Sequence, residues 1–323
     1  MTRRLESHSS IAQDVSDAAI QALLDRGEFF WLDLEQPTDD DKTLIRDTLG
    51  ITGVSHGGFD HVGRRPSFDD YDDFDLVTVY GAAEVEPSGM DRLVEVHCLV
   101  SKRFLVTLHD QPSPALDDAV GGCAHGHDQP ASPAEALHRV VDLMVESLLP
   151  IIGELDARGD ELADAVLENP AADIQREILQ TRRRVIALRR VAIPQRDMLG
   201  RLSDAQEPDV PGMTRDVSRR FRSDYERMVR VVDALDGARD AAQAATDVYL
   251  GTVNNRLNVV MKQLTVLAGI FLPLTFLTGY FGQNFGWMVD HVGSAWAFVV
   301  LGLVLPVLLV LGLLQYFRQQ HWL

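Results

Sequence analysis

Two apolar runs near the C-terminal end decide how this chain is organised. Residues 263–281 read QLTVLAGIFLPLTFLTGYF, and residues 295–317 read AWAFVVLGLVLPVLLVLGLLQYF. Each run reaches the ~20 residues that cross a hydrocarbon layer about 30 Å thick, and Asp290 is the only formally charged residue from Gln263 to Phe317. We predict two transmembrane helices, joined by a loop over 282–294. The alternative is a soluble protein in which the two runs form a helical hairpin, and it requires the rest of the chain to bury both runs.

The charges that flank the two runs predict their orientation. Arg256 and Lys262 precede the first run and Arg318 follows the second, whereas the loop carries only Asp290. Because the cytoplasmic flanks of membrane helices are enriched in Lys and Arg, we expect both chain ends in the cytoplasm, the loop outside, and a cytoplasmic tail over 318–323. The chain is therefore predicted to be a multi-pass protein of the inner or plasma membrane.

The composition argues against several classes of protein. Among 323 residues, 30 are Lys or Arg and 48 are Asp or Glu, which gives a formal net charge of −18. A nucleic-acid binder needs basic surface to displace counterions from phosphates, whereas an acidic chain attracts cations. Cys98 and Cys123 form no CxxC pair. The sequence has no P-loop, nucleophile-elbow or HExxH motif, so we predict neither an enzyme nor a bound cofactor.

Residues 1–131 are predicted to form a cytosolic α/β domain. The expected strands are the β-rich runs at 29–34, 76–80, 94–100 and 104–108. Ser101–Arg103 is the expected hairpin turn between the last two, and Thr38 is the expected N-cap of a short helix. The acid-dense stretch FDDYDDFD at 68–75 is predicted to be a solvated turn before a strand, and the alternative is attraction of cations at a subunit boundary.

Residues 132–211 are predicted to form antiparallel cytosolic helices. A capping box at Ser132–Glu135 opens the first helix, and Pro150 and Pro194 are expected bends. The second helix carries an arginine cluster, for which salt bridges to nearby carboxylates are predicted rather than phosphate binding; its members are Arg182, Arg183, Arg184, Arg189 and Arg190. Before these helices, CAHGHD at 123–128 is predicted to be a flexible loop, with zinc binding by Cys123, His125 and His127 as the alternative.

A stalk helix is predicted over 212–262, continuing into the first apolar run. Apolar or small residues recur there every three or four positions, at Val217, Phe221, Tyr225, Met228, Val231, Leu235, Ala238, Ala242, Ala245, Tyr249 and Thr252. This spacing indicates a coiled-coil-like seam, packed either on helices of the same chain or between copies. A helix ending at Phe281 would be roughly 100 Å long at ~1.5 Å per residue, so most of it is expected to project into the cytosol.

One stripe of the first run is a candidate site. Its members share one helical face and include no carboxylate: Asn258, Met261, Leu264, Thr265, Ala268, Leu272, Thr275 and Gly279. Small residues favour close helix packing in membranes, and that is the first interpretation. The second is a pore lining in which Met261 and Leu264 form a hydrophobic constriction that closes by dewetting.

An ordered set of motifs resembles the CorA-type divalent metal ion transporters, a two-span superfamily marked by Gly-x-Asn after the first span. The matching segments are YLGTVNNRLN at 249–258, MKQLT at 261–265, IFLPLT at 270–275, YFGQNF at 280–285 and the terminal Trp322-Leu323. The resemblance implies a funnel-shaped homopentamer in the lipid bilayer, with cytosolic α/β domains on long stalk helices and a pore lined by the first span. It also implies that Gly282, Gln283 and Asn284 form the ion-selective outer mouth.

The resemblance implies transport of a divalent cation, with Mg²⁺ favoured and Co²⁺, Ni²⁺ and Zn²⁺ as further candidates. Mg²⁺ gives up its waters reluctantly, so a carboxylate-free stripe suits passage of a hydrated ion. Because the usual Gly-Met-Asn is here Gly282-Gln283-Asn284, a ZntB-like proton-coupled zinc transporter is one alternative. A non-conducting, membrane-anchored metal sensor is the other.

The resemblance also suggests where a regulatory metal would bind. In magnesium-gated members, acids near the base of the stalk bind ions between subunits and hold the pore shut. The nearest acids here are Asp224 and Glu226, whereas Ser223 stands where the key acid is expected.

Overall fold

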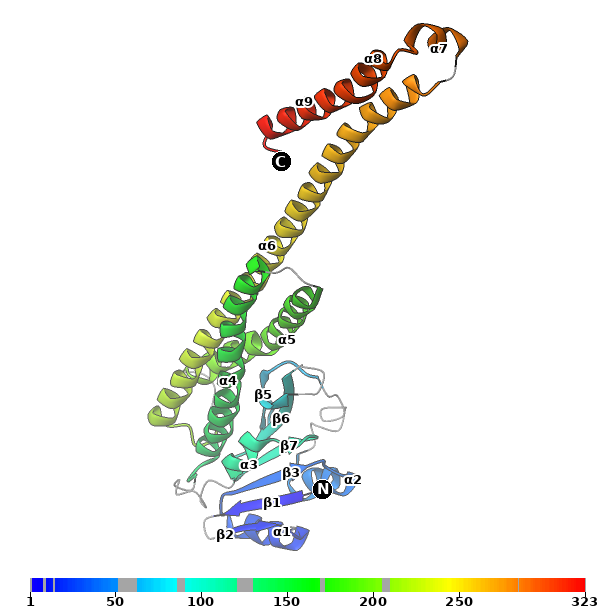
Figure 1. Ribbon diagram of the computed structural model, residues 1–323. Helices are drawn as coiled ribbons and strands as arrows, with labels where there is room; N and C mark the ends of the chain where they lie inside the picture. The colour runs from blue at the N-terminus through cyan, green and yellow to red at the C-terminus, as the bar shows by residue number, and fades with distance from the viewer. Residues whose placement is uncertain are drawn as a thin grey trace. The chain divides into compact units, whose positions relative to one another are not determined.

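The chain divides into two compact units, Met1–Thr246 and Asp247–Leu323 (Figure 1). The computed structural model describes residues 2–7, 10–13, 15–51, 63–85, 91–120, 130–168, 172–204, 210–283 and 285–322. Asn284 lies outside these residues, and so do Cys123, His125 and His127 with their zinc alternative.

The first unit is built on a mixed sheet that, within the described residues, has seven strands in the order β2-β1-β3-β7-β6-β5-β4. The strands are β1 (Thr2–Ser7), β2 (Ser10–Gln13), β3 (Phe30–Glu35), β4 (Ser67–Asp70), β5 (Asp75–Val85), β6 (Asp91–Val100) and β7 (Phe104–His109). Only β3 and β7 pair in parallel; the other neighbours are antiparallel.

The predicted strands are confirmed as β3, β5, β6 and β7, and Val100 pairs with Leu105 across the predicted hairpin. The stretch 68–75 forms β4 and the turn into β5, so the predicted turn is confirmed, with part of the stretch in a strand that was not predicted. Sequence reasoning also missed β1, because TRRLES shows no apolar alternation. Its Arg4 forms ion pairs with Asp33 of the neighbouring strand β3, at 3.2 Å, and with Asp117, outside the sheet, at 2.5 Å.

Helices cover both faces of the sheet, which explains why its central strands are apolar on both sides. One face packs against α3 (Pro114–Val120), α4 (Pro133–Glu168) and α5 (Ala172–Leu202), and buried residues from the first part of α6 (Arg215–Phe281) join the same core. The other face packs against α1 (Asp17–Arg26) and the π-helical turn η1 (Leu44–Thr48), and α2 (Asp39–Thr43) is joined to β1 by the Arg3–Asp41 ion pair. Alternate residues of β7 divide accordingly: Leu105 joins the first core, and Phe104 and Val106 join the second.

The predicted helix caps are partly confirmed. Thr38 caps α2 in a full capping box with Asp41. At α4, the Ser132 hydroxyl accepts the Glu135 N–H at 3.3 Å, but the Glu135 carboxylate accepts the Ala131 N–H, not that of Ser132. The predicted box is therefore wrong in its second half, because the carboxylate reaches one residue further back.

The apolar seam of α6 is packed inside its own chain. Phe221, Met228 and Leu235 are fully buried in the first core, among residues of α4 and α5. A Cβ atom on Gly159 of α4 would lie only 3.1 Å from the Ala241 Cβ, so the helices approach closely there. From Val217 to Ala245 the seam is thus packed within its own chain, as the same-chain interpretation predicted, and this part gives no argument for association between copies.

Two helix side chains replace a missing strand at one edge of β5. Strand β4 pairs with β5 only as far as Thr78. Beyond it, the Tyr80 N–H donates to the Gln195 Oε1 at 2.8 Å, and the Gln195 Nε2 donates to the Tyr80 carbonyl at 3.1 Å. The Ala82 N–H donates to the Ser147 hydroxyl at 2.8 Å. Buried backbone groups need such partners, so α4 and α5 are fixed to the sheet by hydrogen bonds as well as by packing.

We expect Gln195→Leu to destabilise the protein by about 2–4 kcal/mol, because it leaves a buried N–H and a buried carbonyl of Tyr80 without partners. The measurement is chemical denaturation of the detergent-solubilised chain followed by near-UV circular dichroism. Gln175→Leu, an exposed position on the same helix, is the control and should stay within about 0.5 kcal/mol of wild type. Equal losses in the two variants would contradict the role of the Tyr80–Gln195 pair.

Candidate ion-conducting segment

The second unit consists of the end of α6 and the apolar helices that follow it. After Phe281 the chain forms α7 (Gly286–Val292), α8 (Ala295–Ala297), the π-helical segment η3 (Phe298–Val304) and α9 (Leu305–Gln319). The sequence did not predict α7, a short helix inside the expected loop, nor the π-helical segment. Both apolar windows are long enough to cross a membrane, and only 6% and 0% of their residues are buried. The buried-hairpin alternative is therefore wrong, since the chain does not cover these helices.

The first apolar run turns one side toward α9. The residues that are half-buried or buried on this side are Val266, Gly269, Ile270, Pro273, Leu274, Leu277 and Phe281. The contact is closest at Gly269, where a Cβ atom would lie 2.8 Å from the Phe317 Cζ. Phe317 is 8% exposed and also stacks on Trp322, with ring centroids 6.0 Å apart.

The candidate stripe lies on the other side of the helix. At about 100° per residue, its positions are roughly opposite the side that contacts α9. All eight residues are exposed in this chain: Asn258, Met261, Leu264, Thr265, Ala268, Leu272, Thr275 and Gly279. The stripe therefore does not pack on its own second apolar helix.

The threonines of the stripe have their hydroxyl protons bound to the helix itself. Thr265 donates to the Met261 carbonyl and Thr275 to the Phe271 carbonyl, each at 2.8 Å. A hydroxyl oxygen keeps acceptor capacity after donating its proton. Each threonine thus presents an acceptor, which suits a cation that arrives with its water shell.

Helix α6 ends at the predicted mouth. The Gly282 N–H still bonds the Thr278 carbonyl at 2.9 Å, and the Gln283 N–H bonds the Tyr280 carbonyl at 3.4 Å. Gly282 and Gln283 are exposed, and Gln283 lines an apolar hollow of about 280 Å³ together with Phe281 and Phe298.

The structure does not bring the two predicted regulatory acids together. Asp224 is 1% exposed; its carboxylate forms an ion pair with Arg227 and lies 3.2 Å from the His138 Nε2. Glu226 is exposed and 3.5 Å from Arg222. Both carboxylates are thus engaged by cationic or imidazole groups of their own chain. No group of three metal-ligating side chains occurs anywhere in the described residues.

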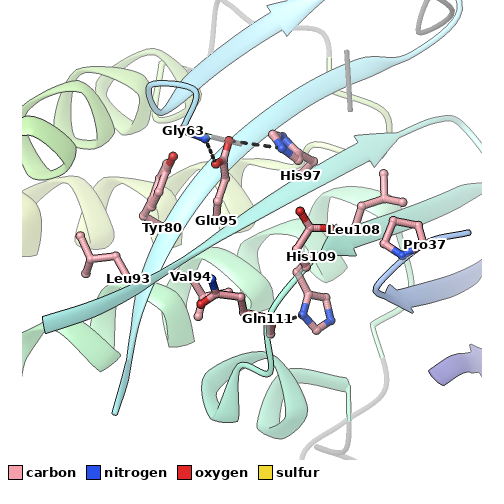
Figure 2. A pocket seen from close by; sticks show the side chains of 11 residues that line it. Pro37, Gly63, Tyr80, Leu93, Val94, Glu95, His97, Leu108, His109 and Gln111 are labelled. Carbon is pink, nitrogen blue, oxygen red and sulfur yellow. Dashed lines mark hydrogen bonds and ion pairs between the residues drawn. The ribbon is translucent and has the colours of Figure 1, made fainter. Parts of the chain in front are cut away.

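A small cavity in the first unit collects titratable groups without forming a metal site (Figure 2). It measures about 120 Å³ and is lined by Glu95, His97, His109 and Asp110, among others. The Glu95 carboxylate accepts the Gly63 and Arg64 N–H groups and lies 3.3 Å from the His97 Nε2. Burial lowers the pKa of His97, and the charge of Glu95 offsets this only in part.

The pKa of His109, which lines the same cavity, is shifted in the opposite direction. Burial acts to lower its pKa, but the negative charge of Asp33, 3.4 Å from the His109 Nε2, raises that pKa above its ordinary value. Asp33 is held in turn by the Thr107 hydroxyl at 2.7 Å, and Thr107 accepts the Trp31 indole N–H at 3.0 Å. Hydrogen bonds thus link Trp31, Thr107 and Asp33 into a buried structural network in the sheet, and His109 lies beside the Asp33 carboxylate.

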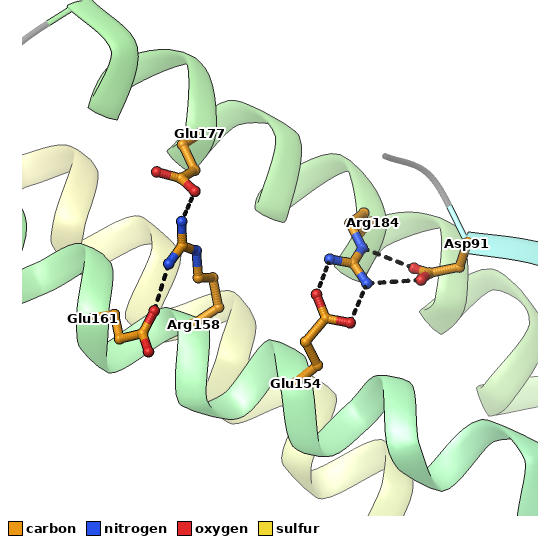
Figure 3. Close-up of polar contacts among 6 residues, drawn as sticks. All are labelled: Asp91, Glu154, Arg158, Glu161, Glu177 and Arg184. Carbon is orange, nitrogen blue, oxygen red and sulfur yellow. Dashed lines mark hydrogen bonds and ion pairs between the residues drawn. The ribbon is translucent and has the colours of Figure 1, made fainter. Parts of the chain in front are cut away.

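Two arginines of the cluster on α5, Arg184 and Arg189, form the predicted salt bridges to carboxylates. Arg184 bridges Asp91 and Glu154, and its hydrogen bonds to them raise its pKa (Figure 3). Arg189 pairs with Asp236 at 2.7 Å. Arg158 of α4 likewise bridges Glu161 and Glu177 (Figure 3). The other three members, Arg182, Arg183 and Arg190, are exposed and form no ion pair within the described residues.

The model of the CorA-like Mg2+ transporter protein family matches residues 26–319. The chain belongs to this family. Family members are ion transporters rather than enzymes, and with its two exposed apolar helices the chain is a membrane protein.

Individual relatives carry different metals in their names. The cobalt/magnesium transport protein CorA of Thermotoga maritima is 32% identical over 188 residues, 58% of this chain and 52% of that protein. The zinc transport protein ZntB of Yersinia enterocolitica is 26% identical over 295 residues, 91% of this chain and 88% of that protein.

The fold is that of the CorA magnesium transporter from Methanocaldococcus jannaschii. The two superpose with a TM-score of 0.82 at 19% identity, over 100% of this chain and 99% of the other. The predicted α/β domain, long helix and two C-terminal apolar helices are confirmed.

We expect Gly269→Ala to lower the thermal stability of the second unit, because its new methyl group would press on the Phe317 ring; such overpacking costs about 1–3 kcal/mol. The control is Gly302→Ala in η3, where the new Cβ would meet Phe298 at an ordinary 3.5 Å. Thermal unfolding in detergent, followed by tryptophan fluorescence, compares the two. A Gly269→Ala variant as stable as Gly302→Ala would contradict the Phe317 contact.

Proposed function

We propose that the chain is a CorA-type channel for divalent metal cations, in which several copies place the stripe of their first spans around a shared path. The observation that carries this proposal is the stripe itself: it is exposed along its whole length, contains no carboxylate and faces away from its own second apolar helix. Mg²⁺ is the favoured ion, with Co²⁺, Ni²⁺ and Zn²⁺ as further candidates.

The chemistry of the stripe fits a hydrated ion. Mg²⁺ dehydrates reluctantly and usually keeps several waters, so oxygen acceptors that hydrogen-bond to those waters hold it weakly enough to release it. In this proposal Asn284, with Gly282 and Gln283, forms the selective mouth. Thr275, Thr265 and Asn258 supply further acceptors along the path.

The apolar part of the stripe supplies the gate. Met261 and Leu264 are 59% and 58% exposed in the single chain, and Leu272 is 72% exposed. Rings of such side chains around a narrow path exclude water and stop conduction until they separate. Ala268 leaves room between Leu264 and Leu272, and Gly279 leaves room between Leu272 and the outer mouth.

The proposed assembly is a homopentamer in the inner or plasma membrane, with both chain ends in the cytoplasm and residues 282–294 outside. Arg256, Lys262 and Arg318 at the cytoplasmic flanks support this orientation. Residues 1–131 and 132–211 then form the cytosolic body, 212–262 the stalk, and 263–281 and 295–317 the two spans.

A second candidate is proton-coupled zinc transport, favoured by the similarity to ZntB over 91% of the chain. The two apolar runs contain no ionisable Asp, Glu, His, Lys or Arg. A proton relay would therefore use Asp290 and His291 in α7, or acids of the cytosolic body. A non-conducting metal sensor is the third candidate, and flux measurements distinguish all three.

We expect Asn284→Ala to reduce Mg²⁺ uptake into proteoliposomes at least tenfold, which corresponds to about 1.4 kcal/mol of lost stabilisation at the mouth. Asn255→Ala, an exposed asparagine of α6 outside the stripe, should conduct like wild type. Uptake of Mg²⁺ and Zn²⁺ is measured with and without a pH gradient. Zinc uptake by the wild-type protein that requires the pH gradient would favour the proton-coupled zinc transporter. Absence of any metal uptake by the wild-type protein would leave only the non-conducting sensor.

We expect Leu264→Ser to raise basal cation leak several-fold, because a hydroxyl ring wets a constriction that closes by excluding water. Leu267→Ser is the matched control, since Leu267 is 56% exposed and is not a member of the stripe. Fluorescent dye influx into proteoliposomes at low driving force measures the leak. Equal leaks in the two variants would show that the stripe is not the conducting face.

A further inference from the structure

The first turns of α6 present an exposed face rich in arginine. We name it the arginine face; it comprises Arg215, Asp216, Arg219, Arg222, Ser223, Glu226 and Arg230, all exposed. Within it, Arg219 pairs with Asp216 at 2.5 Å and Arg222 with Glu226 at 3.5 Å, whereas Arg215 and Arg230 form no ion pair in the described part of the chain. Four arginines against two carboxylates leave a net charge of +2, in a chain whose total is −18.

The arginine face lies on the turns of α6 where the resemblance to magnesium-gated transporters suggests a regulatory cation site. Asp224, on the buried side of the same turns, is closed off by Arg227 and His138. A divalent cation is repelled by such a face, whereas a carboxylate surface is attracted to it.

The turn between β4 and β5 is the complementary surface. We name residues 70–73 the acidic turn; Asp70, Tyr71, Asp72 and Asp73 are all exposed. The three aspartates form no ion pair within the described residues. Contacts between Tyr71 and Phe74 stabilise the conformation of this turn. The Tyr71 N–H donates to the Phe74 carbonyl at 3.0 Å, and the two rings stack with centroids 4.8 Å apart. Phe74 is buried in the core.

We propose that the arginine face of one copy binds the acidic turn of the next copy around the ring. A cyclic assembly requires two different, complementary surfaces on each subunit, and the first unit carries such a pair with charges of opposite sign. Tyr71, 39% exposed, adds a ring on which an arginine guanidinium can stack. This inference rests on the proposed multi-subunit channel and adds that its subunits are joined by direct arginine–aspartate pairs.

The consequence concerns regulation. A contact made of arginine and aspartate forms without any metal ion, so depletion of divalent cations does not release it. Added salt weakens it, because exposed charges are screened within about 10 Å at 0.1 M ionic strength. The ring contact is therefore insensitive to Mg²⁺ and sensitive to ionic strength.

The test is thiol cross-linking of the full-length protein in detergent. Ser223→Cys and Asp72→Cys are combined in a Cys123→Ser background and treated with a short bifunctional methanethiosulfonate in EDTA. We expect a ladder of covalent oligomers, because each copy is linked to two different neighbours. Each single-cysteine variant should give little product and none beyond a dimer.

Charge reversal provides the decisive comparison. The double change Arg219→Glu and Arg222→Glu should lower the yield of cross-linked oligomers about fivefold, because like charges then face each other. The second double change, Asp70→Arg and Asp73→Arg, made in the same protein, should restore that yield. A linked monomer band alone, a ladder that needs Mg²⁺, or no rescue by the second pair would overturn the inference. Asn284→Ala should lower flux at least tenfold and leave the ladder intact, so failure of the ladder with normal flux counts against this inference and not against the channel.

Discussion

The contact between Gly269 and Phe317 fixes which side of the first apolar helix is free. A helix that crosses a bilayer has no hydrophobic reason to prefer one rotation, since lipid tails are as apolar as its own side chains, and close packing decides instead. Here the absence of a side chain at Gly269 admits the Phe317 ring, and a Cβ atom would meet it at 2.8 Å. The stripe from Asn258 to Gly279 lies on the side that this contact leaves open.

In the proposed function, that open side is the path for hydrated ions. It alternates amide or hydroxyl oxygens with apolar side chains and carries no fixed negative charge. Fixed carboxylates would hold a divalent ion tightly, whereas weak acceptors and a hydrophobic constriction permit passage and closure. The acidic residues that give the chain its charge of −18 are placed elsewhere.

In the first unit, several buried polar groups are paired with one another inside the chain. Gln195 and Ser147 complete the edge of β5, and the Trp31–Thr107–Asp33–His109 network runs through the sheet. Low dielectric strengthens such satisfied networks and penalises any unpaired member. Exposed charges are positive on the first turns of α6 and negative at the β4–β5 turn, and this distribution is what suggests contact between copies.

The sequence by itself determined the elements with strong periodic signals: the central strands of the sheet, the helices α4, α5 and α6, and the two apolar runs. Contacts between residues far apart in the chain decided the position of strand β1, the packing of the α6 seam and the orientation of the stripe. The charged strand β1 is held by Arg4 pairing with residues distant in sequence, and the seam of α6 proved to be packed on its own chain, which spacing alone does not distinguish from a seam between copies. The stripe was visible as a pattern, but only the packing of Phe317 on Gly269 established that it faces away from its own second helix. Periodicity specifies which residues share a face; the partner of that face depends on packing between residues far apart in the chain.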